Sequence, residues 1–129
     1  MSGYTIVNLQ DVENTASEGG PRLEARMARS AIDSDHLGVS YVRWAPDRRS
    51  DRGHAHREQE EVYVVLGGSG SVKLDDEVRH LRQWDVVRVA PATFRGFSAG
   101  PDGLELLAIG SDRPEGGDSV QSEDEWWTA

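Results

Sequence analysis

The sequence of 129 residues contains no cysteine. Disulfide bonds, thiolate metal ligands and cysteine nucleophiles are therefore excluded. The absence is in keeping with a reducing compartment, where proteins are rarely stabilised by disulfides.

Long apolar runs are also lacking. No window approaches the roughly 20 apolar residues that a membrane-spanning helix needs. Residues 1–10 do not combine a basic start with an apolar run, so we expect no signal peptide. These absences predict a soluble, cytoplasmic protein with no membrane partner.

The chain has no excess of positive charge. It carries 14 Lys and Arg against 23 Asp and Glu, a net charge of −9, which makes nucleic acid a poor partner. The charge is uneven, because residues 112–129 are acidic whereas residues 43–57 are rich in arginine. A solvated loop is the interpretation of the arginine-rich stretch that we favour, and a rim that attracts an anionic ligand is the alternative.

What the sequence does contain is a series of short β-branched and aromatic runs, separated by glycine, proline and aspartate. This rhythm predicts many strands with short turns, and hence an all-β sandwich or barrel. We expect turns at Gly67-Gly68, at Asp75-Asp76 and within residues 100–103. The expected strands are 22–29, 38–44, 61–66, 71–74, 77–81, 85–89, 94–98 and 104–109. The first of these also contains good helix formers and is compatible with a short helix.

We expect one domain, with an N-terminal segment (1–20), a barrel (21–111) and an acidic tail (112–129). Residues 61–66 are apolar on both faces beyond the first residue, and such a strand needs cover on both sides. We therefore expect a homodimer. The tail ends in Trp126-Trp127, which are costly to leave in water. We expect this end to dock, as a clasp on the barrel or across a dimer rather than as a lid.

Two histidines and an acid stand out in the stretch from Gly53 to Tyr63. His54 and His56 are two residues apart, so in an extended chain they point to the same side. Glu61 follows after a short bend and can join them. Two imidazoles and one carboxylate make a mixed site suited to Fe, Mn, Ni, Cu or Zn, with positions left open for water or substrate. The alternative is a surface turn with two solvated histidines.

The arrangement His54-x-His56, then Glu61, then Gly68 resembles the first motif of the cupin superfamily. The resemblance implies a jelly-roll barrel of two antiparallel sheets, with His54, His56 and Glu61 as metal ligands. It selects Glu61 over Glu60, because the liganding acid normally precedes the strand that bears the aromatic residue.

Residues 84–97 resemble the second motif of the cupin superfamily. Trp84-Asp85 stands where that motif has a glycine followed by an acidic residue. Arg95 then stands where the family has its last metal-ligand histidine. A guanidinium stays charged and cannot ligate a metal. Three outcomes are open: Arg95 turns aside and leaves three ligands, an anion bridges Arg95 and the metal, or no metal binds and Arg95 pairs with Glu61.

The resemblance implies a small cupin that binds a divalent metal and acts on a small polar or anionic molecule, as an oxygenase, isomerase, epimerase or cyclase. Arg95 and Tyr63 are the expected catalytic residues, and both, with Phe97, are expected to contact the substrate. The alternative is a non-catalytic small-molecule-binding cupin without metal, whose pocket is anchored by Arg95. A structural dimer with a relic pocket is a third interpretation.

Overall fold

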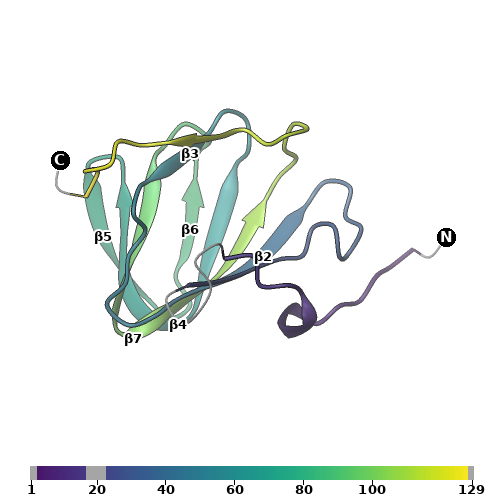
Figure 1. Ribbon diagram of the computed structural model, residues 1–129, viewed down its shortest axis with the longest axis horizontal. Coiled ribbons are helices and arrows are strands. Elements are labelled where there is room, and N and C mark those ends of the chain that lie inside the picture. The colour runs from purple at the N-terminus through teal and green to yellow at the C-terminus, as the bar shows by residue number, and fades with distance from the viewer. Residues whose placement is uncertain (1–2, 17–22, 128–129) are drawn as a thin grey trace.

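The computed structural model describes residues 3–16 and 23–127, and almost all of its regular structure is β-strand (Figure 1). The elements are a short 3₁₀ helix η1 (Leu9–Asp11) and the strands β1 (Leu23–Met27), β2 (Gly38–Trp44), β3 (His54–His56), β4 (Glu61–Leu74), β5 (Glu77–Arg82), β6 (Val86–Val89), β7 (Arg95–Gly110) and β8 (Ser119–Gln121). Among the residues described, no helix is both long enough and apolar enough to span a membrane.

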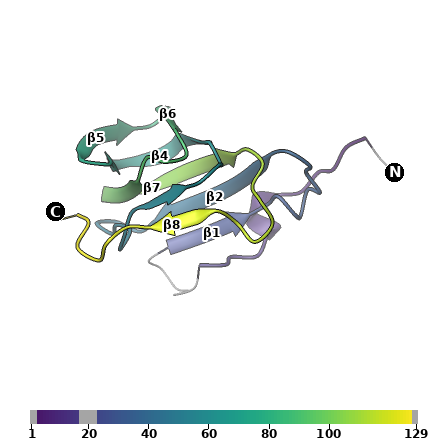
Figure 2. The same cartoon turned by 90° about the horizontal axis from the view of Figure 1, so that it is seen from above.

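Two long antiparallel strands, β4 and β7, organise the molecule. The first part of β4 pairs with the last part of β7, and the last part of β4 pairs with the first part of β7. Strands β1, β2 and β6 extend the first of these layers, whereas β3, β5 and β8 extend the second. The result is a curled sheet with two layers that enclose one interior, as expected for a jelly-roll barrel (Figures 1 and 2).

The predicted turns at Gly67-Gly68 and at residues 100–103 were wrong. The runs 61–66 and 71–74 are one strand, as are 94–98 and 104–109. Gly68 and Gly103 take left-handed backbone conformations, with φ of +72° and +81°, and the register of β4 against β7 shifts on either side of this point. A Cβ atom on Gly68 would lie 2.1 Å from the carbonyl oxygen of Gly103. The glycines therefore bend both strands from one layer into the other instead of ending them.

The other expected strands lie close to where the pattern predicted them. Residues 38–44 form β2, and the turn at Asp75-Asp76 joins β4 to β5. The ambiguous first run is a strand, β1, because its backbone pairs with β2 from Leu23↔Trp44 to Met27↔Ser40. Pairing with a neighbour outweighs the helix propensity of this segment.

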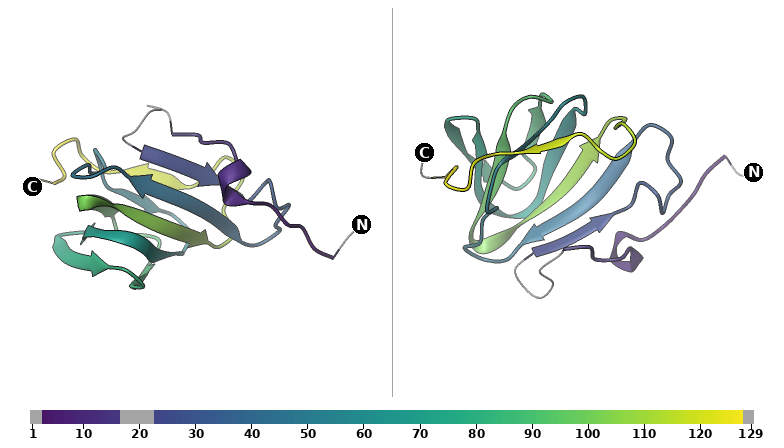
Figure 3. Two further views of the ribbon diagram at one scale, coloured as in Figure 1. Left: turned by 90° about the horizontal axis from the view of Figure 1, so that it is seen from below. Right: turned by 45° about the horizontal axis from the view of Figure 1, so that its top comes forward.

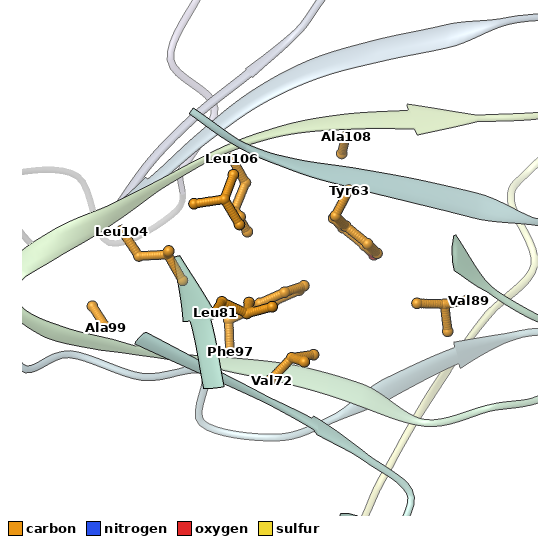
Figure 4. Close-up of a cluster of buried hydrophobic side chains, with 10 residues drawn as sticks. Tyr63, Val72, Leu81, Val89, Phe97, Ala99, Leu104, Leu106 and Ala108 are labelled. Carbon is orange, nitrogen blue, oxygen red and sulfur yellow. The ribbon is translucent and has the colours of Figure 1, made fainter. Parts of the chain in front are cut away.

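The apolar core fills the interior between the two layers (Figure 4). Val65, Leu104 and Leu106 have 1% or less of their surface exposed. The remaining buried members come from both layers and are Tyr63, Val72, Leu81, Val89, Phe97, Ala99 and Ala108.

The C-terminal tail packs along the second layer (Figure 3). Strand β8 pairs with β3. The Trp126 ring packs against Gly53 and Gly96, so closely that a Cβ atom on either glycine would lie 2.8 or 2.7 Å from it. Gly96 follows the inward-pointing Arg95, so it faces the outside of the barrel. Trp126 therefore sits on the outer face, as a clasp does. The division into segments 1–20, 21–111 and 112–129 stays a prediction.

Further contacts hold the tail in place. Trp127 donates from Nε1 to the carbonyl of Ser50 at 2.6 Å, and Arg49 lies 5.4 Å from the centre of its ring. Arg52 pairs with Asp124. Part of the arginine-rich stretch therefore neutralises and covers the acidic tail.

The outward face of β4 is apolar, as the sequence indicated. Val62 lies opposite Ile109 and Val64 opposite Leu107, and all four are only partly buried. A second copy of the chain would cover them, and the homodimer stays a prediction.

Candidate metal centre

The three residues predicted as metal ligands come together at one end of the interior. Strand β3 directs His54 and His56 inward and Ala55 outward, by the alternation of an extended chain. Glu61 opens β4 and reaches them from the other layer. One potential ligand atom from each residue lies within 4.8 Å of the other two.

The distances suit a shared cation. Glu61 Oε1 lies 3.1 Å from His56 Nε2 and 3.6 Å from His54 Nε2. Two ligand atoms each about 2.1 Å from a metal are roughly 3.0 to 3.5 Å apart at the angles of octahedral or tetrahedral coordination. The side chain of His56 is 10% exposed and that of Glu61 15%, whereas that of His54 is 36% exposed. The site is therefore open to solvent on the His54 side.

Asp118, in the tail, is the residue of this centre that the sequence analysis missed. One of its carboxylate oxygens lies 2.8 Å from His56 Nδ1, and the other accepts from the backbone amides of Glu58 and Gln59, also at 2.8 Å. Burial raises the pKa of Asp118, but the amide of Glu58, His56 and the amide of Gln59 outweigh it and lower the pKa to about 2. Asp118 is thus an ionised partner that orients His56. No local signal distinguishes it from the other acids of the tail.

The contact with Asp118 limits what His56 can offer to Glu61. A ring that donates from Nδ1 carries either a proton or a lone pair on Nε2, and the lone pair can bind a metal. Burial raises the pKa of Glu61, yet hydrogen bonds with His54 and Tyr63 and the charges of the two histidines lower it to about 2, so the group is a carboxylate. A lone pair and a carboxylate oxygen 3.1 Å apart repel each other unless a cation or a proton lies between them. The set therefore fits a bound metal ion.

Tyr63 lies beside Glu61, and Phe97 packs against Tyr63 within the core. The Tyr63 hydroxyl donates to Glu61 Oε1 at 2.6 Å, and the two aromatic rings meet edge to face at 4.8 Å. Burial, followed by the charge of Glu61, raises the pKa of Tyr63 well above its usual value, so the phenol keeps its proton. The expected substrate contacts of both residues stay predictions.

Arg95 also reaches this end of the interior, and its guanidinium lies beside Glu61. The side chain is fully buried and donates to the carbonyls of His54 at 3.2 Å and Ala90 at 3.4 Å. Its Nε lies 3.9 Å from Glu61 Oε1 and has no hydrogen-bond partner. The three outcomes considered for Arg95 stay open, because its guanidinium contacts two main-chain carbonyls and also lies within ion-pair distance of Glu61. The catalytic and substrate-binding roles of Arg95 stay predictions.

Comparison with known proteins rests on structure. No model of a known protein family matches the sequence, and no curated protein matches it. A sugar phosphate isomerase of the cupin superfamily from Silicibacter pomeroyi is 19% identical with a TM-score of 0.71, over 84% of this chain and 76% of that one. The polyketide cyclase RemF from Streptomyces resistomycificus is 20% identical with a TM-score of 0.74, over 94% and 89%.

Two other solved structures are larger than the region they share with this chain. A point variant of oxalate decarboxylase from Bacillus subtilis is 20% identical with a TM-score of 0.76, but the match spans 95% of this chain and 33% of that one. A putative sugar phosphate isomerase from Acidithiobacillus ferrooxidans is 24% identical with a TM-score of 0.63, over 70% of this chain and 59% of that one. Identities at this level establish architecture. The chain has the cupin fold, a single-domain jelly-roll barrel.

Proposed function

We propose that the protein binds one divalent metal ion at His54, His56 and Glu61, and that it acts on a small anionic molecule at the open positions of that ion. The observation that carries the proposal is the convergence of two imidazole nitrogens on one ionised carboxylate oxygen, at 3.1 and 3.6 Å. The contact between His56 and Asp118 supports it, because metal-ligating histidines usually donate their other ring N–H to a carboxylate or carbonyl.

The surrounding residues have separate tasks in this proposal. A metal bound there would supply Lewis-acid chemistry, and the donor set suits Fe, Mn, Ni, Cu or Zn. In this proposal Tyr63, whose hydroxyl donates to Glu61, transfers a proton to a substrate oxygen. His54, the most exposed ligand, marks the side from which a substrate would enter.

The charge balance favours an anionic substrate. A divalent ion and the buried guanidinium of Arg95 together carry more positive charge than Glu61 and Asp118 neutralise. An anion at the open position removes this excess in a site of reduced dielectric. The names of two structural neighbours include sugar phosphate and oxalate, both of which are anions. Isomerisation, epimerisation, cyclisation and oxygenation are all compatible with this arrangement.

Metal content tests the proposal. Protein purified without a chelator or a histidine tag should contain close to one transition-metal ion per chain by elemental analysis. Changing both His54 and His56 to alanine should remove that metal. His80→Ala is the matched control, since it removes an exposed imidazole of β5 and should leave the metal in place.

A wild-type protein that stays metal-free even after incubation with Mn²⁺, Fe²⁺, Ni²⁺, Cu²⁺ and Zn²⁺ would refute the proposal. If small carboxylates raised its melting temperature all the same, the metal-free binding module would replace it.

A further inference from the structure

A second hollow of the molecule lies next to Glu61. It is a cavity of about 40 Å³ that Glu61, Arg29, Gln59 and Arg113 help to line. A volume of this size exceeds that of a single water and admits a small polar group. Because Glu61 borders both the cavity and the metal centre, one small molecule can extend from one to the other.

Two glycines shape this cavity. Gly38 of β2 lies opposite Gly110 of β7 in the sheet register. A Cβ atom on Gly38 would lie 2.5 Å from the Arg29 guanidinium, and one on Gly110 would lie 2.4 Å from the amide nitrogen of Gln59. The absence of side chains at both positions therefore makes room for these polar groups beside Glu61.

The two arginines at the cavity are not neutralised. Arg29 donates to the main-chain carbonyls of Ser111, at 2.6 Å, and Gly110, at 3.5 Å. Within residues 3–16 and 23–127, neither Arg29 nor Arg113 forms an ion pair with a carboxylate. Six other arginines do form such pairs: Arg26, Arg43, Arg52, Arg79, Arg88 and Arg95. The cavity thus concentrates unpaired positive charge next to the metal centre.

We propose that this cavity binds a carboxylate of the substrate. Arg29 and Arg113 hold it, because a planar guanidinium matches the two oxygens of a carboxylate. A second oxygen of the same small molecule reaches the open side of the metal centre past Glu61. The substrate class is then a small organic acid with a second oxygen-bearing group. This inference rests on the proposed function for the role of the metal, and the cavity and its charges stand without it.

Titration calorimetry with malonate, at constant ionic strength, tests the inference. The protein is titrated with and without Mn²⁺, and inorganic phosphate and neutral glycerol are titrated alongside. Arg113→Ala should weaken malonate binding tenfold or more, and Arg29→Lys should weaken it by a smaller factor, because the lysine keeps the charge and loses the paired donors. Mn²⁺ affinity should be unchanged in both variants. Arg79→Ala is the control that removes one exposed arginine elsewhere.

The outcomes are separable from those of the metal proposal. If Mn²⁺ fails to bind but Arg113→Ala still weakens malonate binding to the metal-free protein, the metal proposal fails and the carboxylate subsite stands. Malonate affinity that is the same in Arg113→Ala and Arg79→Ala would overturn the subsite. Phosphate binding tighter than malonate, and lost in Arg113→Ala, would overturn the choice of a carboxylate.

Discussion

The interior of the barrel has an apolar half and a polar half, and the same strands build both. Along β4, the inward positions run from Glu61 through Tyr63 to Val65, which is completely buried. Inward residues of an extended strand follow each other at roughly 7 Å. The environment therefore changes from an ionised carboxylate to a dry core within two such steps.

This contrast separates stability from function within one small domain. Burial of side chains such as Leu104 and Leu106 contributes to folding without specific polar partners. The polar half contains buried charges, whose desolvation opposes folding unless they are paired. Tyr63 joins the halves, because its ring packs against Phe97 while its hydroxyl donates to Glu61.

The largest expected effect lies in the apolar half. Leu106→Ala removes a side chain that is 1% exposed and leaves a cavity. It should lower the free energy of unfolding by about 3 kcal/mol, as measured by urea denaturation. Mn²⁺ affinity of the folded variant should stay within about twofold of the wild type, because Leu106 belongs to the apolar core and is not one of the candidate ligands. A loss of metal binding comparable to that of the His54 and His56 double variant would mean that the halves are not independent.

A smaller effect is expected for Arg95→His, which should raise the affinity for Mn²⁺ and lower the stability of the metal-free protein. A guanidinium about 4 Å from a divalent ion meets repulsion of roughly 8 kcal/mol at an effective dielectric of 20. Its removal and the added imidazole should tighten Mn²⁺ binding by about tenfold or more in a competition with a chelator. The metal-free variant should unfold more easily, by about 1 to 3 kcal/mol, because the carbonyls of His54 and Ala90 lose their donors.

Weaker Mn²⁺ binding in Arg95→His would show that position 95 is not where a fourth ligand can stand. The variant Arg95→Met controls for the loss of charge. It should bind Mn²⁺ more tightly than the wild type but less tightly than Arg95→His.

The third effect, a loss of metal affinity, is expected for Asp118→Asn. The amide is uncharged and cannot accept three N–H groups as the carboxylate does. Metal affinity should fall 10- to 100-fold, the range found when such orienting partners are removed. The visible spectrum of the Co²⁺-loaded protein should change as well, because the orientation of His56 changes.

Val120→Ala is the matched control for Asp118→Asn. It removes packing from the neighbouring strand β8 and should lower stability without changing the Co²⁺ spectrum. An equal loss of metal affinity in the two variants would show that Asp118 acts by anchoring the tail and does not orient His56.

Several features were predictable because they depend on residues close together in sequence. The alternation rule alone placed His54 and His56 on one side of a strand, and the Asp75-Asp76 turn followed from its residue types.

The position of the glycine–acid pair of the second motif shows how a turn is kept without glycine. Trp84 takes a left-handed φ of +75°, where the resemblance has glycine, and Asp85 accepts a hydrogen bond from the Arg82 amide. The turn is kept by the acid and its pairing, despite the strain expected at a bulky residue.

Other features depended on partners far away in the chain. The sequence predicted turns at Gly68 and Gly103. In the structure the two glycines lie against each other, and each bends its strand instead of ending it. The sequence left three outcomes open for Arg95, and only the structure shows that its guanidinium contacts two main-chain carbonyls and lies 3.9 Å from Glu61. The role of Asp118 follows from the pairing of β8 with β3 and has no signature of its own.

The sequence by itself determined that the chain forms short strands around one interior, and that two imidazoles and an acid share one wall of it. Side-chain alternation and residue type are local properties, so they can be read without a fold. Only the tertiary structure decided which carboxylate orients His56, which groups the Arg95 guanidinium contacts and which arginines lie near Glu61. Those contacts join segments that are distant in sequence, and their energies depend on burial and distance, which exist only once the two layers have closed.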